Sequence, residues 1–119
     1  LIALRSMIDA GIRPCIASDY PSGPVGIALI DGAVNRYNRV KSLQLDQTQC
    51  IGVMEAVRCA TVNGAYASFE EGIKGSLEPG KLADMIILSE DITALPKEKL
   101  NEVKVDMTMI GGKVEYERR

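Results

Sequence analysis

The sequence predicts an α/β fold that passes into a region of short β-strands. Two observations predict it. The first 24 residues run from a helix-like apolar pattern through a glycine to a short apolar segment and a polar loop, which is the rhythm of a parallel α/β fold. Near the other end, Gly111-Gly112 joins two β-like segments and favours a tight hairpin, because glycine tolerates positive φ. We therefore expect an α/β portion over residues 1–72 and a β-rich portion over residues 73–119.

The α/β portion begins with an apolar stripe that is typical of a helix over residues 1–10. Gly11 is well placed to end that helix with a positive φ. Residues 12–18 predict a short buried strand, and residues 19–24 form a loop rich in turn formers. A second helix is predicted over residues 25–36, because its apolar residues recur on one side.

The remainder of this portion predicts a loop and one further helix. Residues 37–49 are polar and unpatterned, so we expect a loop there. The helix is predicted over residues 53–68, with Gly52 and Glu55 in a capping arrangement. Small residues dominate its apolar stripe: Val53, Ala56, Val57, Ala60, Gly64 and Ala67. Gly64 costs ~1 kcal/mol of helix stability relative to alanine, so we expect a neighbouring element to pack closely there.

The β-rich portion opens with a turn-rich stretch over residues 75–81 and a strand over residues 83–89. Residues 90–102 are charged and predict a loop or a short helix. The strands of the hairpin are residues 103–110 and 113–117. Apolar and polar residues alternate in the first of these strands, which predicts one buried and one solvated face.

The composition excludes several classes of function. The 119 residues are 46% hydrophobic and 25% charged, and the net charge of -2 removes the electrostatic case for nucleic acid. No apolar run approaches the ~20 residues that span a bilayer. Arg5 and Asp9 interrupt the N-terminal apolar stretch, so it is not a secretory signal. The chain has no histidine, so it cannot form a Ser-His-Asp or Cys-His site, or an imidazole-ligated metal site, from its own residues.

The three cysteines Cys15, Cys50 and Cys59 lie in apolar segments without CxxC spacing. Their odd number and their setting predict buried, reduced thiols in a cytoplasmic protein. None is expected to act as a nucleophile, because no histidine is present to activate it.

Asp19 is the leading candidate for chemistry. It follows the predicted strand and opens a polar loop, and active sites of parallel α/β folds lie at the carboxyl ends of strands. A carboxylate there can bind a metal ion or take a proton from metal-bound water. The alternative is an Asx-turn ahead of Pro21, which is the more common outcome on spacing alone.

Other polar residues are weaker candidates, because each has an ordinary structural explanation as a packed side chain, a helix end, a solvated residue or a turn: Tyr20, Asn35, Arg36, Glu70, Glu71, Lys81 and Asp84. Lys81 has no glycine-rich phosphate loop around it, so an anion site there is not expected. Asp84 is expected to be a buried carboxylate that holds loop amides rather than a ligand.

Five colinear stretches resemble the amidohydrolase superfamily: ASDYP at 17–21, AVNR at 33–36, EAVRCATVNGAYASFEE at 55–71, GSLEPGKLADMIILSED at 75–91 and VDMTMIGGKVEY at 105–116. Gly75, Gly80, Ala83 and Asp84 match a G-x-x-x-G-x-x-A-D turn and strand that recurs in the β-sandwich of those enzymes. The chain resembles most the C-terminal part of the amidohydrolase-3 type, a branch that includes N-substituted formamide deformylase-like enzymes.

The resemblance implies the C-terminal part of a (β/α)8 barrel over residues 1–72, including its last strand, and strands of the β-sandwich domain over residues 73–119. It implies that Asp19 holds a divalent metal, zinc, in the full-length enzyme. It also implies that Asp19 acts as general base towards the metal-activated hydroxide and then as acid towards the leaving amine. The substrate is then a small amide-like molecule.

A complete barrel needs ~250 residues, and the family takes histidine ligands from earlier strands. The resemblance therefore implies that these residues belong to a longer hydrolase. By themselves they are expected to bind no catalytic metal, to be inactive and to self-associate through uncovered strand edges and apolar faces. The alternative hypothesis is a non-catalytic α/β module that serves folding or oligomerisation.

Overall fold

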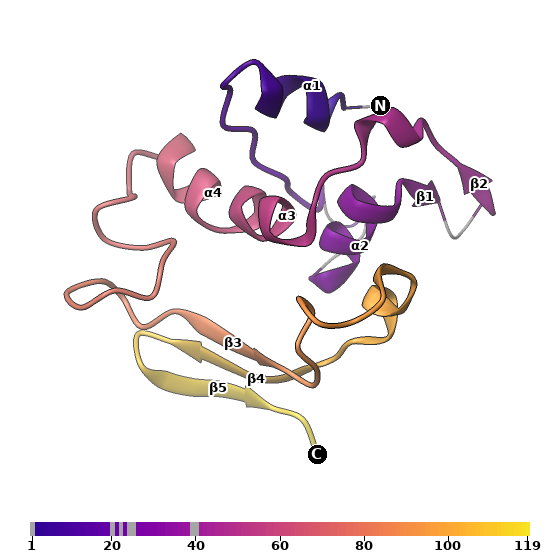
Figure 1. The fold of residues 1–119 in the computed structure, drawn as a ribbon. Helices are drawn as coiled ribbons and strands as arrows, with labels where there is room; N and C mark the ends of the chain where they lie inside the picture. The colour runs from indigo at the N-terminus through magenta and orange to yellow at the C-terminus, as the bar shows by residue number, and fades with distance from the viewer. Residues whose placement is uncertain (1, 20, 22, 24–25, 39–40) are drawn as a thin grey trace.

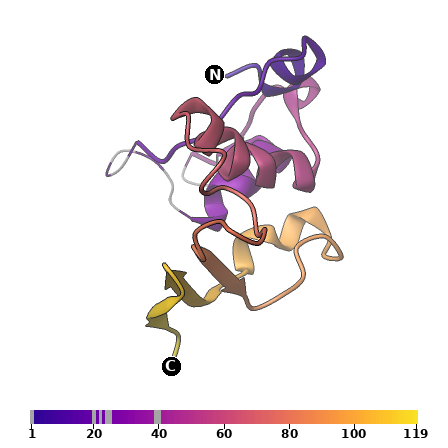
Figure 2. The same cartoon turned by 90° about the vertical axis from the view of Figure 1, so that its left-hand side faces the viewer.

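The computed structural model describes the whole chain apart from residues 1, 20, 22, 24–25 and 39–40. Helices occupy one side of the molecule and a three-stranded sheet lies beneath them, as two perpendicular views show (Figures 1 and 2). In chain order the elements, including two 3₁₀ helices labelled η, are α1 Leu4–Asp9, α2 Ile27–Asn35, β1 Tyr37–Asn38, β2 Leu43–Gln44, η1 Gln47–Gln49, α3 Val53–Ala60, α4 Val62–Ala67, β3 Met85–Leu88, η2 Lys97–Glu102, β4 Val105–Ile110 and β5 Lys113–Glu117.

Local chemistry explains where the first helices end. Gly11 takes φ +77° after α1, and its N–H donates to Ile8 O while the N–H of Ile12 donates to Met7 O. These bonds satisfy the last carbonyls of the helix, as predicted for a glycine at this position. At the end of α2, Arg36 adopts a left-handed conformation at φ +49°. The predicted helices at both places are confirmed, with ends shortened by a few residues.

The strand predicted over residues 12–18 is wrong, because the described backbone there is not part of any ladder. Cys15 and Ala17 are exposed and Ile16 is half-buried, so the segment is not a buried strand either. A strand needs a neighbour to satisfy its N–H and C=O groups, and the described part of the chain offers none. Both sheets of the described residues are antiparallel, rather than the parallel sheet that the helix–strand rhythm predicts.

Two other predictions are corrected. Residues 37–49 are not all loop, because β1 and β2 form a two-residue antiparallel pair and η1 follows them. The helix predicted over residues 53–68 is two helices, since Thr61 leaves the helical region at φ −127°, ψ −93°. Its start is as predicted: Gly52 caps α3, and the N–H of Gly52 donates to Glu55 Oε2 at 2.8 Å.

The close approach expected at Gly64 occurs elsewhere. A Cβ added at Gly64 would meet no atom within 4 Å, whereas one added at Gly75 would lie 2.7 Å from Ala65 Cβ and 3.1 Å from Val62 Cα. Gly75 also takes φ +93°. The chain therefore uses a glycine outside the helix to approach α4, and the exposed side of Gly64 lines a surface hollow of about 630 Å³.

The β-rich portion forms a sheet in the order β3-β4-β5. The predicted hairpin is confirmed: Ile110 pairs with Lys113, and Gly111 and Gly112 take φ +57° and +80°. The predicted alternation of a buried and a wet face is wrong, because five successive residues of β4 are all half-buried. No described residue covers Ile86 of β3 or Tyr116 of β5 completely, and their side chains are 54% and 49% exposed.

The core lies between the helices and η2 rather than within the sheet. It consists of Leu4, Ile30, Ala33, Val34, Ile51, Ala56, Cys59, Ile92, Leu100 and Val103. Ala56 and Leu100 are fully buried. Among the described residues, no helix is long and apolar enough to cross a membrane.

Candidate active site

Asp19 lies at the end of the extended segment that follows α1. Its side chain is exposed, and its backbone takes φ +48°, a left-handed conformation that aspartate tolerates better than most residues. Gly23 returns to the start of this loop so closely that a Cβ there would lie 2.0 Å from Ser18 O. Asp19 makes no hydrogen bond or ion pair within the described residues. Among the residues that the structure describes, the Asp19 carboxylate is thus open to solvent and ties no other group.

The alternative role for Asp19, an Asx-turn ahead of Pro21, conflicts with backbone chemistry. In such a turn the carboxylate accepts a hydrogen bond from the amide two residues further on. That residue is Pro21, and proline has no N–H to donate. The ordinary form of the turn is therefore excluded at this position.

The segment leading to Asp19 lies against α3 and α4. The N–H of Ile16 donates to Cys59 O at 3.1 Å, and Asn63 Nδ2 donates to Pro14 O at 2.9 Å. Just before these bonds, the guanidinium of Arg13 lies 4.7 Å from the centre of the Tyr66 ring. The two helices thus hold the segment by both polar and cation–π contacts.

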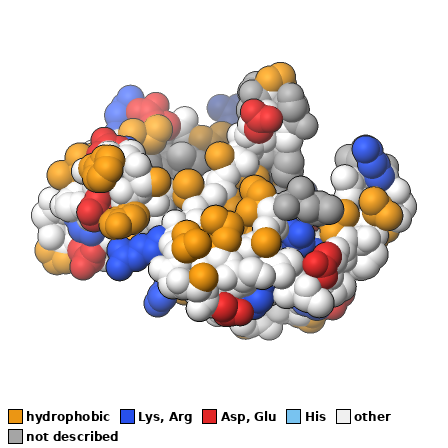
Figure 3. Space-filling view, turned by 90° about the horizontal axis from the view of Figure 1, so that it is seen from above, with side chains coloured by type: hydrophobic (Ala, Val, Ile, Leu, Met, Phe, Trp, Pro, Cys, Tyr) orange, Lys and Arg blue, Asp and Glu red, His pale blue; other side chains and the backbone are white. Residues whose placement is uncertain are grey.

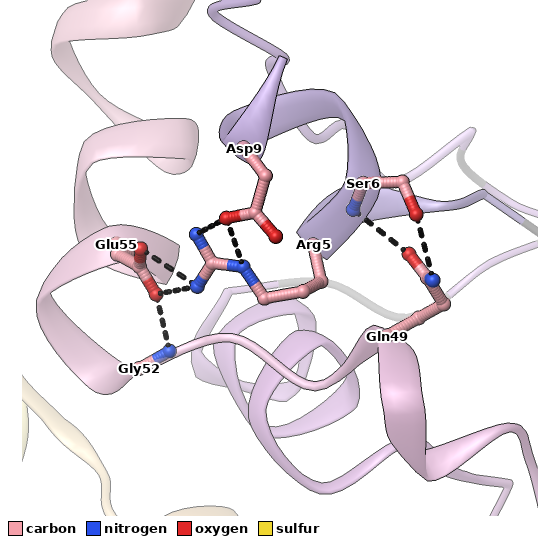
Figure 4. Close-up of polar contacts among 6 residues, drawn as sticks. All are labelled: Arg5, Ser6, Asp9, Gln49, Gly52 and Glu55. Carbon is pink, nitrogen blue, oxygen red and sulfur yellow. Dashed lines mark hydrogen bonds and ion pairs between the residues drawn. The ribbon is translucent and has the colours of Figure 1, made fainter. Parts of the chain in front are cut away.

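A cluster of charged side chains joins α1 to the start of α3 (Figure 4). Arg5 donates from Nε to Asp9 Oδ1 at 2.8 Å and from Nη1 to both carboxylate oxygens of Glu55 at 2.9 Å. The Gly52 amide, and then Arg5, hold the pKa of Glu55 below its ordinary value. Two hydrogen bonds also join Ser6 to Gln49. The backbone N–H of Ser6 donates to Gln49 Oε1, and Gln49 Nε2 donates to Ser6 Oγ. Every carboxylate of this cluster is paired, so the cluster fixes α1 and is not a site.

Three of the weaker candidates, Glu70, Lys81 and Asp84, have structural roles in the β-rich portion or next to it. Glu70 pairs with Lys74 at 2.5 Å, and Lys81 pairs with Glu78 at 2.8 Å. Asp84 Oδ1 accepts from the N–H of Gly111 at 2.7 Å, so it holds a loop amide as predicted, but the residue is exposed and not buried as predicted. In each of these pairs, the charged group that could contact a ligand already binds a neighbouring residue.

The remaining weaker candidates also give no site. Asn35 donates to Asp31 and to Lys97 O, which ties α2 to η2. Arg36 is 6% exposed and donates to Ile2 O at 3.0 Å. Glu71 is an exposed residue in a turn, and Tyr20 lies outside the described residues.

The cysteines differ from one another in exposure. Cys59 is buried as predicted, but Cys50 is half-buried and Cys15 is exposed, so the prediction of three buried thiols is wrong. Cys15 is exposed because its segment packs on the helices with one side only. Burial raises the pKa of the Cys59 thiol, which keeps it protonated and unsuited to metal binding or nucleophilic attack.

A metal ion in a protein is held by a group of His, Cys, Asp or Glu side chains. No group of three His, Cys, Asp or Glu that could hold a metal ion occurs among the described residues. Asp19 by itself offers carboxylate oxygens, which suit a divalent cation, and the chain has no imidazole to add.

Comparison with known proteins identifies the family. The model of the amidohydrolase family matches residues 1–116. The chain belongs to the amidohydrolase family. This membership confirms the resemblance that the motifs indicate.

Relatives of this amidohydrolase chain are several times longer. N-substituted formamide deformylase of Arthrobacter pascens is 34% identical over 118 residues, which cover 99% of the chain and 22% of that protein. Imidazolonepropionase of Porphyromonas gingivalis is 30% identical over 112 residues, covering 94% of the chain and 25% of that protein. The chain thus spans about a quarter of the length of these relatives.

A solved structure shares the fold of the chain. The crystal structure of an amidohydrolase from Thermotoga maritima matches 97% of the chain and 26% of its own length, with a TM-score of 0.66. At 21% identity this likeness concerns the fold alone. It is consistent with a fragment of a larger amidohydrolase fold.

The local sequence singles out Asp19 as a candidate but gives no sign of the contact that Asn63 makes. Asn63 lies within the family-like stretch at 55–71, yet nothing in its local pattern indicates a contact with Pro14, which lies 49 residues away. Only a clue to the packing of α4 on the segment before Asp19 could have revealed it.

Proposed function

We propose that this amidohydrolase chain is the C-terminal portion of a longer metal-dependent hydrolase that cleaves C–N bonds in small amide-like substrates. Family membership supports hydrolytic chemistry in general. The names of two relatives, a formamide deformylase and imidazolonepropionase, support a carbon–nitrogen bond as the target.

The observation that carries the proposal is the placement of Asp19. Its carboxylate is exposed and without a described partner, and it stands directly after a segment that lies along two helices. In this proposal, residues 14–18 become the last strand of a (β/α)8 barrel when neighbouring strands flank them. Asp19 then stands at the carboxyl end of that strand, where barrel enzymes carry their catalytic groups.

Asp19 has two tasks in the proposed mechanism. In the complete protein Asp19 would help to hold a divalent ion, zinc in this proposal, which would supply Lewis-acid chemistry to the site. The Asp19 carboxylate would accept the proton that the attacking water releases, and the same proton would pass to the leaving amine as the C–N bond breaks. The carboxylate ends the cycle unprotonated, so the proton balance closes.

The proposal assigns no activity to the 119 residues by themselves, since they provide one ligand and no imidazole. The partner of the site is a small molecule, because the net charge of -2 offers no electrostatic basis for nucleic-acid binding. We place the protein in the cytoplasm, where its three free cysteines would stay reduced.

The reading frame around this segment and the metal content of the complete protein test the proposal. We expect a frame that continues upstream of Leu1 and encodes a His-x-His pair near an early strand, and a purified protein that binds a divalent metal stoichiometrically. A start codon directly before Leu1 would contradict the proposal and favour a non-catalytic folding or oligomerisation module.

A further inference from the structure

The segment that carries Asp19 is fixed at one place, the junction of α3 and α4. Within the described residues, the bonds Asn63 Nδ2 to Pro14 O and Ile16 N–H to Cys59 O are the hydrogen bonds that tie residues 13–19 to the helices. Pro14 and Cys59 are both buried. Arg13 over the Tyr66 ring adds a contact one residue earlier. Three residues after the second bond, the chain reaches Asp19.

The junction can accept the segment because the helix is interrupted at Thr61. Cys59 lies in the last turn of α3, where carbonyl groups lack intrahelical partners, and its oxygen takes the Ile16 N–H instead. Asn63 lies in the first turn of α4, so its side chain projects beside the same carbonyl region and reaches Pro14 O. Thr61 Oγ1 donates to Val57 O at 2.8 Å, which satisfies another carbonyl at the break.

The junction is also supported on another side. A Cβ at Gly75 would lie 2.7 Å from Ala65 Cβ, 3.1 Å from Val62 Cα and 3.5 Å from Thr61 O, so the backbone at Gly75 lies directly against α4. The start of α4 is therefore confined between this backbone and the segment of residues 13–16. Little movement of Asn63 is possible without a change in one of these contacts.

We propose that Asn63 is a positioning residue for Asp19: its hydrogen bond to Pro14 O sets the register and direction of the segment that presents the carboxylate. This inference rests on the proposed role of Asp19 in the metal site. Asn63 itself touches neither metal nor substrate. Its contribution arises because a misplacement of about 1 Å at a reacting group can cost about 100-fold in rate.

The test is made in the complete protein with two matched truncations. Asn63→Ala removes the amide that holds Pro14 O. Asn35→Ala removes an amide that donates in the same way to a backbone carbonyl, Lys97 O at 2.7 Å, but joins α2 to η2. Asn63→Asp keeps the shape and loses the donor, so it serves if the alanine variant does not fold. Asn63→Gln keeps a donor and should recover part of the loss.

We expect Asn63→Ala to lower kcat about tenfold and to weaken Zn²⁺ binding, measured by chelator competition, about tenfold. KM should change less than about twofold, since the substrate contacts remain. Asn35→Ala should lose comparable stability in urea unfolding while kcat and Zn²⁺ affinity stay at the wild-type level.

Asp19→Asn, measured in parallel, separates two kinds of failure. If Asp19→Asn loses turnover but the Asn63 variants behave like Asn35→Ala, the positioning role is overturned and the proposed function stands. If Asp19→Asn keeps wild-type turnover and Zn²⁺ affinity, the proposed function fails, and the role of Asn63 fails with it.

Discussion

Gly75 shows most clearly how a single residue determines the arrangement of two elements. Its backbone has φ +93°, a conformation that residues with a side chain rarely adopt. A Cβ at this position would also have no room against Ala65 and Val62. Gly80, five residues on in the same turn-rich stretch, has φ +90° but meets no atom within 4 Å at the Cβ position. Comparing the two glycines therefore distinguishes the cost of a positive φ, which both share, from the cost of close packing, which applies at Gly75.

We predict that Gly75→Ala lowers the free energy of unfolding by about 3 kcal/mol, because strain and overpacking add. Gly80→Ala should cost about 1 kcal/mol, since only the strain applies. Urea unfolding of the complete protein measures both. Equal losses at the two positions would contradict the close approach at Gly75.

At the scale of elements, local chemistry was enough for some predictions and not for others. The end of α1 at Gly11, the start of α3 at Gly52 and the β4–β5 hairpin could be predicted, because each depends on residues within a few positions. The strand predicted over residues 12–18 is absent, because a strand forms only beside another strand and the local sequence does not show whether a neighbour exists. The break at Thr61 also has no local signal, because threonine is not a helix breaker and the surrounding packing decides.

The candidate site divides in the same way. Asp19 could be predicted from its place after an apolar run and from the resemblance, because both are properties of the linear sequence. Asn63 could not, since its relation to Pro14 arises from the way α4 packs. The turn of residues 75–81 is family-like in sequence, but its part in confining α4 appears only in three dimensions.

The stability of the contact between α1 and α3 should depend on pH through Glu55. The pKa of Glu55 is lowered in the folded state, first by the Gly52 amide and then by Arg5. Its stabilising contribution is therefore complete above the unfolded pKa of about 4.3 and is lost as the pH falls through the lower folded value. The stability of Glu55→Gln should depend less on pH in this acidic range than that of the wild type.

The control for this prediction is Glu71→Gln, at an exposed residue that makes no hydrogen bond or ion pair within the described residues. Thermal unfolding from pH 6 to pH 3 gives the three profiles. Glu71→Gln should follow the wild type. If the profile of Glu55→Gln also follows that of the wild type, the Glu55 carboxylate does not stabilise the contact between α1 and α3.

At the scale of the whole molecule, the 119 residues leave apolar surface uncovered. Ile86 and Tyr116 flank Thr108 in one row across the sheet and are about half-exposed, and β3 and β5 are both edge strands of this sheet. Seen from the α1 side, hydrophobic side chains also lie in the open among charged ones (Figure 3). Such edges and patches favour association with other chains.

We predict that the isolated 119-residue chain self-associates, with a weight-average mass in light scattering that rises with concentration. Ile86→Lys combined with Tyr116→Lys should reduce the association, because charges on this row oppose stacking and edge pairing. Thr93→Lys, in an exposed turn, is the matched control. A monomer at high concentration would be inconsistent with this account of the surface.

The role of Asp19 as the metal-site carboxylate is the central claim, and turnover together with bound metal in Asp19→Asn of the complete protein tests it most directly. The matched control is Asp46→Asn, at an exposed aspartate that accepts two hydrogen bonds from Thr48 at the start of η1. We predict that Asp19→Asn lowers kcat by at least about 1,000-fold and weakens metal binding, with the free energy of unfolding unchanged, while Asp46→Asn keeps both functions. Near-normal turnover and metal content in Asp19→Asn would contradict the central claim.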